Sequence, residues 1–295
     1  DYSEPEFLIS TMDRHKEWAV IICLVGGGQE INTGEAGLPE WFDSLRRQFL
    51  DWDVYITPNL NDEEYRRSNE WKDLIMGLNV YEVEKLHLST SVRSFRTPDL
   101  ADLIKAILDV NINKAKVLYD RCKFKYPIII TREIAKAKAW IRTQCQGTTR
   151  YGLLASSGAL RLKPEGIFVK NDISVENWFL NEKSDVRSSY YLEDVVTEFD
   201  IQGLELDYSI VAWDADLRFE NNEWNYYNFS GKRWNNVNSI NKRIYLKNSY
   251  RVLLTRARQG MVIFIPKGDN DDNTRETKYY DGIYNYLKAI GIDEI

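Results

Sequence analysis

The sequence predicts an α/β protein whose mostly parallel sheet carries helices on both faces. Along the 295 residues, strand-like apolar runs alternate with helix-like segments, which is the pattern of connected βαβ units. The runs Trp18–Val25, Pro127–Thr131 and Met261–Pro266 are almost continuously apolar. Such runs are typical of strands buried on both faces of a parallel sheet, so we expect each of them inside the sheet.

Apolar periodicity and turn residues place the other elements in order along the chain. Residues 38–49 repeat apolar side chains at helical spacing, with Pro39 in the first turn, where a helix needs no N–H donor. Residues 218–237 are rich in Asn, Trp and Tyr and predict a hairpin or an excursion from the sheet. We expect helices at 4–15, 38–49, 98–108, 132–145, 241–258 and 279–290, and strands at 18–25, 52–57, 85–91, 127–131, 151–155, 208–213 and 261–266.

Composition narrows the functional classes. The formal net charge is −6, whereas proteins that coat nucleic acid are usually basic, so any nucleic-acid contact has to be a local groove. Cys23, Cys122 and Cys145 form no CxxC pair, so we expect free thiols and no metal site. The sequence has no apolar run of roughly 20 residues and no secretory signal at Asp1. We therefore expect a cytoplasmic protein that does not bind a membrane.

The segment Asn248–Gly260, NSYRVLLTRARQG, concentrates basic residues just before a predicted buried strand. It places Arg251, Arg256 and Arg258 near the end of a predicted helix. Cations at a helix C-terminus are favoured by the helix dipole, which is one explanation. The other is that an arginine projects from the domain surface toward a phosphate on a neighbouring domain, where its planar fork stabilises negative charge. Spacing alone leaves both explanations open.

Four segments resemble motifs of superfamily 1 helicases, in the order of that family. LLTRAR at 253–258 resembles motif VI, and TEFDIQGLELD at 197–207 resembles motif V. LSTSVRSF at 88–95 resembles motif IV, and GGGQE at 26–30 lies where motif III ends its strand. The wording of LVGGGQEINTGEAGLPEW, SVRSF, EFDIQGLELD and YRVLLTRAR is similar to bacterial Schlafen-group helicase-like P-loop ATPases.

The resemblance implies a RecA-like fold in two parts. Residues 1–80 would be the remnant of a first RecA-like domain with a linker, and 81–295 a second RecA-like domain with an aromatic-rich insertion at about 218–237. The family's P-loop, GxxxxGK[ST], and its acidic DEAQ-like motif are not present in this sequence. The resemblance therefore implies that ATP and Mg²⁺ are bound by an N-terminal P-loop domain of the same protein. We expect neither to bind tightly to this chain, and we expect the chain alone to be inactive.

The resemblance also assigns nucleotide-directed roles. Arg256 would meet the γ-phosphate, Arg93 would be its motif IV counterpart, and Gln29 would sense the γ-phosphate or relay to nucleic acid. The alternative for Arg93 is a solvated arginine after a strand, and the alternative for Gln29 is a turn residue that binds the backbone. The residues implied to bind the nucleotide are Gly203, Glu205, Gln202 and Arg258. Glu205 has the alternative of a helix-start carboxylate.

Nucleic-acid contacts are expected at two places. Thr197 belongs to the motif that couples nucleotide to nucleic acid in the family. Trp224, Lys232 and Arg233 combine an aromatic ring with basic side chains, and such a combination can stack exposed bases. The alternative for these aromatic residues is a small satellite core.

Two functions remain open from the sequence. The first is the C-terminal portion of an ATP-dependent translocase or helicase that acts on single-stranded DNA or RNA. It requires the arginines to face outward toward a phosphate-carrying neighbour. The second is a non-catalytic RecA-like interaction or nucleic-acid-binding module.

Overall fold

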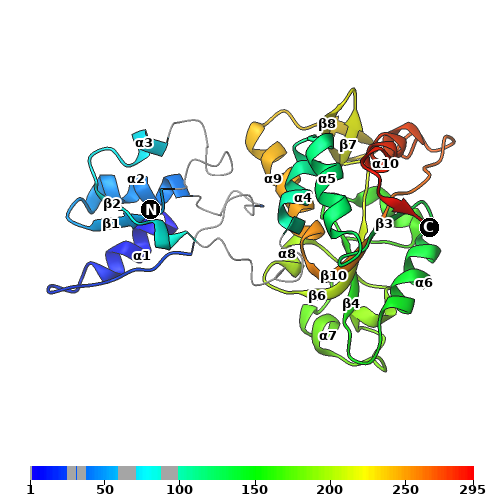
Figure 1. The fold of residues 1–295 in the computed structure, drawn as a ribbon, viewed down its shortest axis with the longest axis horizontal. Coiled ribbons are helices and arrows are strands. Elements are labelled where there is room, and N and C mark those ends of the chain that lie inside the picture. The colour runs from blue at the N-terminus through cyan, green and yellow to red at the C-terminus, as the bar shows by residue number, and fades with distance from the viewer. Residues whose placement is uncertain (1, 25–30, 32–37, 59–70, 88–98) are drawn as a thin grey trace. The chain divides into compact units, whose positions relative to one another are not determined.

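The computed structural model describes residues 2–24, 31, 38–58, 71–87 and 99–295 (Figure 1). The chain divides into two compact units, Asp1–Ser91 and Val92–Ile295. Among the described residues, no helix combines the length and the apolar composition needed to cross a membrane. In the same residues, no cluster of three or more His, Cys, Asp or Glu side chains has the arrangement of a metal site.

The first unit is a small αβ assembly. Its two described strands pair in parallel, with Asp53 opposite Asn79. The core beneath them is formed by Ile9, Phe42, Leu45, Phe49 and Ile56. The elements are α1 (Glu4–Met12), α2 (Leu38–Gln48), β1 (Asp53–Ile56), α3 (Trp71–Leu74), β2 (Asn79–Glu82) and the 3₁₀ helix η2 (Glu84–Leu86).

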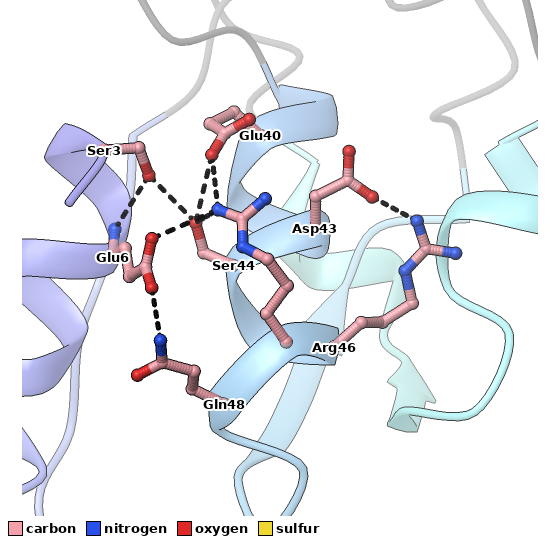
Figure 2. A network of polar contacts seen from close by, with 8 residues as sticks. Ser3, Glu6, Glu40, Asp43, Ser44, Arg46 and Gln48 are labelled. Carbon is pink, nitrogen blue, oxygen red and sulfur yellow. Dashed lines mark hydrogen bonds and ion pairs between the residues drawn. The ribbon is translucent and has the colours of Figure 1, made fainter. Parts of the chain in front are cut away.

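A polar network joins α1 to α2 (Figure 2). The carboxylate of Glu6, which is 7% exposed, accepts hydrogen bonds from Arg47 Nη2 at 3.2 Å and from Gln48 Nε2 at 2.7 Å. Arg47 also donates to Glu40 at 2.7 Å, and the hydroxyls of Ser3 and Ser44 lie 3.2 Å apart. Because a buried carboxylate is tolerated only with donors of this kind, the network fixes how the two helices pack.

The strand predicted at 18–25 is not formed in its described part, and that prediction is wrong. Residues 18–24 are irregular, and Trp18, Val20, Ile22 and Leu24 are between 63% and 83% exposed. Ile21 alone packs against the core of the unit. A strand needs a neighbour for its backbone hydrogen bonds, and β1 and β2 pair only with each other among the described strands. The strand predicted at 85–91 is also absent from its described part, where η2 occupies 84–86.

The second unit is built on a parallel sheet of six described strands, in the order β11-β3-β10-β6-β4-β5, confirming the predicted α/β class. Its strands are β3 (Ile128–Thr131), β4 (Tyr151–Ala155), β5 (Val195–Val196), β6 (Leu206–Ala212), β10 (Ala257–Phe264) and β11 (Asp293–Glu294). Its helices are α4 (Asp99–Leu108), α5 (Ile112–Cys122), α6 (Ile134–Gln144), α7 (Val175–Leu180), α8 (Glu198–Ile201), α9 (Ile240–Leu254) and α10 (Lys278–Ile290), with 3₁₀ helices η3 (Leu160–Glu165) and η4 (Ser189–Tyr191).

Helices cover both faces of this sheet (Figure 1). Alternate strand residues, such as Leu153, Ile210 and Val262, form one core with Ala137 and Ile141 of α6. From β6 the chain runs back across the sheet, through α9 to β10 and through α10 to β11. Because right-handed crossovers in this reverse direction lie on the other face of a sheet, α9 and α10 cover the face opposite to α6. Helices α4 and α5 pack with α9 and α10 there.

A three-stranded antiparallel meander occupies the region predicted as a hairpin or excursion. It consists of β7 (Leu217–Glu220), β8 (Glu223–Ser230) and β9 (Arg233–Asn236). The backbone of β7 passes so close to α10 that a Cβ at Gly282 would lie 1.9 Å from the carbonyl oxygen of Phe219. Only a glycine permits this approach between the strand and the helix.

Candidate functional site

The amino ends of β6 and β10 bring together the residues that resemblance assigns to the nucleotide. The two strands pair in parallel from Leu206 opposite Ala257, and the Leu206 N–H donates to the carbonyl of Arg256 at 3.0 Å. The segment Gln202–Glu205 therefore lies beside Arg256 and Arg258, although some fifty positions separate them in the sequence.

Arg256 does not project from the surface in this structure, contrary to expectation. Its side chain is 1% exposed, and Nε donates to the carbonyl of Val252 at 3.0 Å. The helix predicted to 258 ends at Leu254, so Arg256 lies in the short connection between α9 and β10. Arginine is almost never fully buried unless it is paired or hydrogen-bonded, and the bond to Val252 turns this guanidinium back toward α9.

Arg258 is the exposed arginine at this edge. It lies in β10 with its side chain 49% exposed, and Nη2 donates to Asp207 Oδ1 at 2.8 Å. Gln259 Nε2 donates to the same oxygen at 2.9 Å. Consecutive strand residues normally point to opposite faces, but a bulge places both Arg258 and Gln259 opposite Asp207, between the pairs Leu206–Ala257 and Tyr208–Gly260.

Asp207 organises this edge and was not among the predicted site residues. Besides the two side chains of β10, its Oδ2 accepts the backbone N–H of Arg150 at 2.8 Å, just before β4. One carboxylate thus joins the beginnings of three adjacent strands. The signal for it was present in the quoted segment QGLELD, whose last residue opens a buried strand with a charge.

The loop before β6 turns through a left-handed glycine. Gly203 has φ +91°, and a Cβ there would meet no atom within 4 Å, so the position is open on its outer side. Gln202 is exposed and Glu205 is half-buried. An open, glycine-containing loop beside an arginine allows a phosphate to approach the backbone closely.

Thr197 lies at the other end of the sheet. It follows β5, whose Val196 is opposite Leu154 near the carboxyl end of β4. Thr197 caps α8 through Asp200, whose carboxylate accepts from its N–H at 2.8 Å and from its hydroxyl at 2.7 Å. The predicted nucleotide and nucleic-acid residues of motif V are therefore separated along the strand direction.

The meander divides its predicted contacts between its interior and its tip. Trp224 is 8% exposed and packs among Trp213, Phe219 and Tyr286, with ring centroids 5.2 to 5.7 Å away. The expectation that this ring stacks bases is not met, because its faces are covered by other rings. Lys232 and Arg233 are exposed at the turn between β8 and β9. Arg93 and Gln29 lie outside the described residues.

The family model that matches this chain is described as Schlafen group 3, DNA/RNA helicase domain, and the match covers residues 1–267. It includes β6, β10 and the edge built around Asp207. Neither a curated protein nor a solved structure matches the chain.

Proposed function

This chain belongs to the Schlafen group 3 DNA/RNA helicase domain family, and on that premise we propose that it is the arginine-supplying part of an ATP-dependent nucleic-acid translocase or helicase. A helicase-like, nucleic-acid-related role follows from the family itself. The proposal adds that a P-loop domain of the same protein binds ATP and Mg²⁺, and that this chain contacts the bound nucleotide.

The observation that supports this most is the convergence at the amino ends of β6 and β10. An open loop at Gly203 adjoins an exposed guanidinium at Arg258, which is oriented by Asp207. Backbone N–H groups and a planar guanidinium are the donors that phosphate oxygens require. Because Arg258 is half exposed, its ion pair with Asp207 is weak enough to be exchanged for a phosphate.

In the proposed reaction, the transferred phosphoryl group spreads negative charge over its equatorial oxygens in the transition state. An arginine stabilises that charge without having to gain or lose a proton. The exposure of Arg258 supports it as a candidate for this role. Arg256, which the family resemblance puts at the γ-phosphate, has to be released from its bond to Val252 first. We propose that docking of the nucleotide-bearing domain moves the connection between α9 and β10 and exposes Arg256.

The test is ATP hydrolysis by the intact protein, with its P-loop domain, in the presence and absence of single-stranded DNA and RNA. Arg256→Ala and Arg258→Ala are compared with Arg187→Ala, which removes an exposed arginine paired with Asp185 at 2.7 Å. We expect kcat to fall about 10³-fold or more for the arginine that meets the γ-phosphate, with KM little changed, and the control to be unaffected. Turnover unchanged in both variants contradicts the proposal.

Two further measurements separate catalysis from folding and from the alternative. Urea unfolding of Arg256→Lys, which keeps the charge but not the fork, reports any loss of stability at this buried position. The 295-residue chain alone should not hydrolyse ATP. If the intact protein binds single-stranded nucleic acid but never hydrolyses ATP, the non-catalytic module is the correct description.

A further inference from the structure

A group of buried carboxyl side chains lies at the carboxyl ends of β4 and β6, away from the edge around Asp207. The chain leaves β4 toward β5 on one side and leaves β6 toward β10 on the other. Neighbouring strands whose connections diverge in this way form the topological switch point of an open α/β sheet. Here the loop Ser156–Gly158 after β4 meets the turn Trp213–Asp216 after β6.

Three carboxyl groups are buried where these segments meet. Asp214 and Asp216 are each 1% exposed, and Glu198, at the start of α8, is 2% exposed. A buried carboxylate is strongly destabilised unless its oxygens receive hydrogen bonds or a cation lies beside it. The supply of donors therefore decides which of the three can carry a negative charge.

Two of the three carboxyl groups, Glu198 and Asp214, accept hydrogen bonds through both oxygens. Glu198 accepts from Ser157 through both oxygens, from the backbone N–H at 2.8 Å and from the hydroxyl at 2.8 Å. Asp214 accepts the N–H of Arg161 at 2.8 Å on Oδ2 and the hydroxyl of Tyr280 at 3.0 Å on Oδ1. Both oxygens of each group therefore accept a hydrogen bond.

Only one of the two carboxyl oxygens of Asp216 accepts a hydrogen bond in the described part of the chain. Its Oδ1 accepts the hydroxyl of Tyr250 at 2.5 Å, whereas its buried Oδ2 makes no hydrogen bond in the described part of the chain. No ion pair joins Asp216 to a basic residue there, and Arg161, whose N–H binds Asp214, pairs through its side chain with Asp272 at 2.6 Å. A negative charge on Asp216 would be left uncompensated two residues from Asp214.

Oδ2 lies against the loop that follows β4, where no hydrogen bond to it is formed in the described part of the chain. The Ser156 hydroxyl is close to this carboxyl group, accepts the N–H of Gly158 at 3.1 Å, and lowers the pKa of Asp216 when its own proton points toward the carboxylate. A Cβ at Gly158 would lie 3.0 Å from Oδ2 and 3.4 Å from this hydroxyl, so the loop closes tightly over the carboxyl group. A proton on Oδ2 could be donated to the Ser156 oxygen, which has a lone pair to spare.

We propose that Asp216 is a neutral carboxylic acid in the folded protein, that its proton fastens the Ser156–Gly158 loop to the turn after β6, and that losing this proton loosens the loop. Glu198 ties the same loop to α8, so the loosening extends to the helix that Thr197 caps. The device therefore couples proton concentration to the carboxyl edge of the sheet. It does not depend on ATP or on the arginines.

The pKa of Asp216 is shifted in the direction that its burial predicts. Burial, and after it the charge of Asp214, raises the pKa of Asp216 from 3.8 to about 7. The hydroxyls of Tyr250 and Ser156 oppose this rise, and burial raises the pKa of Tyr250 itself well above 10, so Tyr250 remains a donor. Burial also raises the pKa of Asp214, against the opposing effect of the Arg161 amide and the Tyr280 hydroxyl. Glu198 is the other charge facing Asp216, and it raises the pKa further.

The sign of the effect follows from linkage. A group whose pKa is higher in the folded than in the unfolded protein stabilises the fold at low pH and loses that contribution as the pH rises. For Asp216 the loss runs from about pH 4 to about pH 7 and is complete above that. Over this range the folding equilibrium constant falls about tenfold per pH unit on account of this one group.

The test compares the full chain with Asp216→Asn, whose amide donates to Ser156 at every pH. Urea unfolding is followed between pH 5 and 8.5 by hydrogen exchange of peptides from β4 and β6. Relative to Asp216→Asn, the wild type should lose about 50-fold in folding equilibrium constant from pH 5 to 7, and nothing further above pH 8. The exposed Asp172→Asn serves as the charge-matched control and should keep the wild-type slope.

Infrared spectroscopy of the wild type provides a measurement that does not depend on a variant folding. A protonated-carboxyl band present at pH 6 should disappear with a midpoint near pH 7. Tyr250→Phe removes the hydroxyl that donates to Asp216 Oδ1 at 2.5 Å and should move that midpoint upward. Parallel pH profiles of the wild type and Asp216→Asn, or no protonated-carboxyl band at pH 6, would overturn the proposal.

Discussion

The carboxylate of Glu198 accepts hydrogen bonds from both the backbone N–H and the side-chain hydroxyl of Ser157. The carboxylate comes from the first residue of α8 and the serine from the loop after β4, 41 positions earlier in the chain. Both bonds are 2.8 Å long, and Glu198 is almost completely buried. The loops that follow β4 and β5 therefore act as one piece at the carboxyl edge of the sheet.

Glu198→Ala should lower the free energy of unfolding of the second unit by about 3 kcal/mol. The substitution leaves the amide and hydroxyl of Ser157 without their charged acceptor, and bonds to charged groups contribute more than neutral ones. Urea denaturation followed by hydrogen exchange of β4 peptides measures the change. Glu193→Ala, at an exposed glutamate of the same unit, should stay within about 0.5 kcal/mol of the wild type. Equal losses of unfolding free energy in the two variants would show that the hydrogen bonds between Glu198 and Ser157 do not stabilise the second unit.

Glu6→Ala should loosen the junction between α1 and α2 (Figure 2). Removing this buried carboxylate leaves Gln48 without the acceptor at 2.7 Å and leaves Arg47 bonded to Glu40 but no longer to α1, so we expect the first unit to lose about 2 kcal/mol of stability. Faster amide exchange in peptides from α1 is the expected readout. The charge-matched variant Glu17→Ala removes an exposed side chain and should leave that exchange unchanged. If α1 exchanges at the wild-type rate in Glu6→Ala, the network does not hold the helices.

Gly282→Ala should destabilise the contact between α10 and the meander. The new methyl group would overlap the carbonyl oxygen of Phe219, so either α10 or β7 has to move. Overpacking of this kind costs about 1–3 kcal/mol, even though alanine is the better helix former. Asn285→Ala, at an exposed position of the same helix, should be neutral or slightly stabilising in the same urea titration. A Gly282→Ala chain as stable as the wild type would mean that the two elements are not in close contact in solution.

Lys232→Ala combined with Arg233→Ala tests the exposed tip of the meander as a nucleic-acid contact. If both side chains neutralise phosphates, the double variant should bind single-stranded DNA or RNA more weakly, and the slope of log affinity against log salt should decrease by up to about two. Lys116→Ala combined with Arg121→Ala removes the same charges from exposed positions of α5 and is the matched control. The tip is not a binding site if both double variants lose affinity equally.

The sheet of the second unit was predictable because several of its strands lie in continuous apolar runs that are visible in the sequence. The apolar run Pro127–Thr131 contains β3, and the run Met261–Pro266 overlaps the second half of β10, since strands buried on both faces need no polar alternation. The first half of β10 was not predicted as strand. The run at 18–25 has the same composition and fails, because pairing depends on a neighbouring strand and not on the run itself. Helix α5 was not predicted, because lysines between its apolar residues obscure the helical apolar spacing in the sequence.

The candidate site was predictable in its sequence position but not in its geometry. Motif resemblance assigned Gly203 and Arg258 to the nucleotide; the structure has them on neighbouring segments, and their nucleotide-binding roles remain predictions. It gave no indication that Arg256 is buried, because burial is set by packing between α9 and β10 after the chain has folded. Asp214 and Asp216 were missed as well. Their only sequence signal is a pair of aspartates directly after a buried apolar strand.

The bulge in β10 has a consequence for how this edge tolerates change in length. Two residues of β10 share one partner position on β6, so the convergence of Arg258 and Gln259 on Asp207 depends on a single extra residue. Deleting one residue there would restore a regular ladder, in which neighbouring side chains alternate between faces. A shortened chain could keep every charge of this edge and still separate the guanidinium from its carboxylate. At this edge, residue spacing along the strand is as much a part of the site as residue identity.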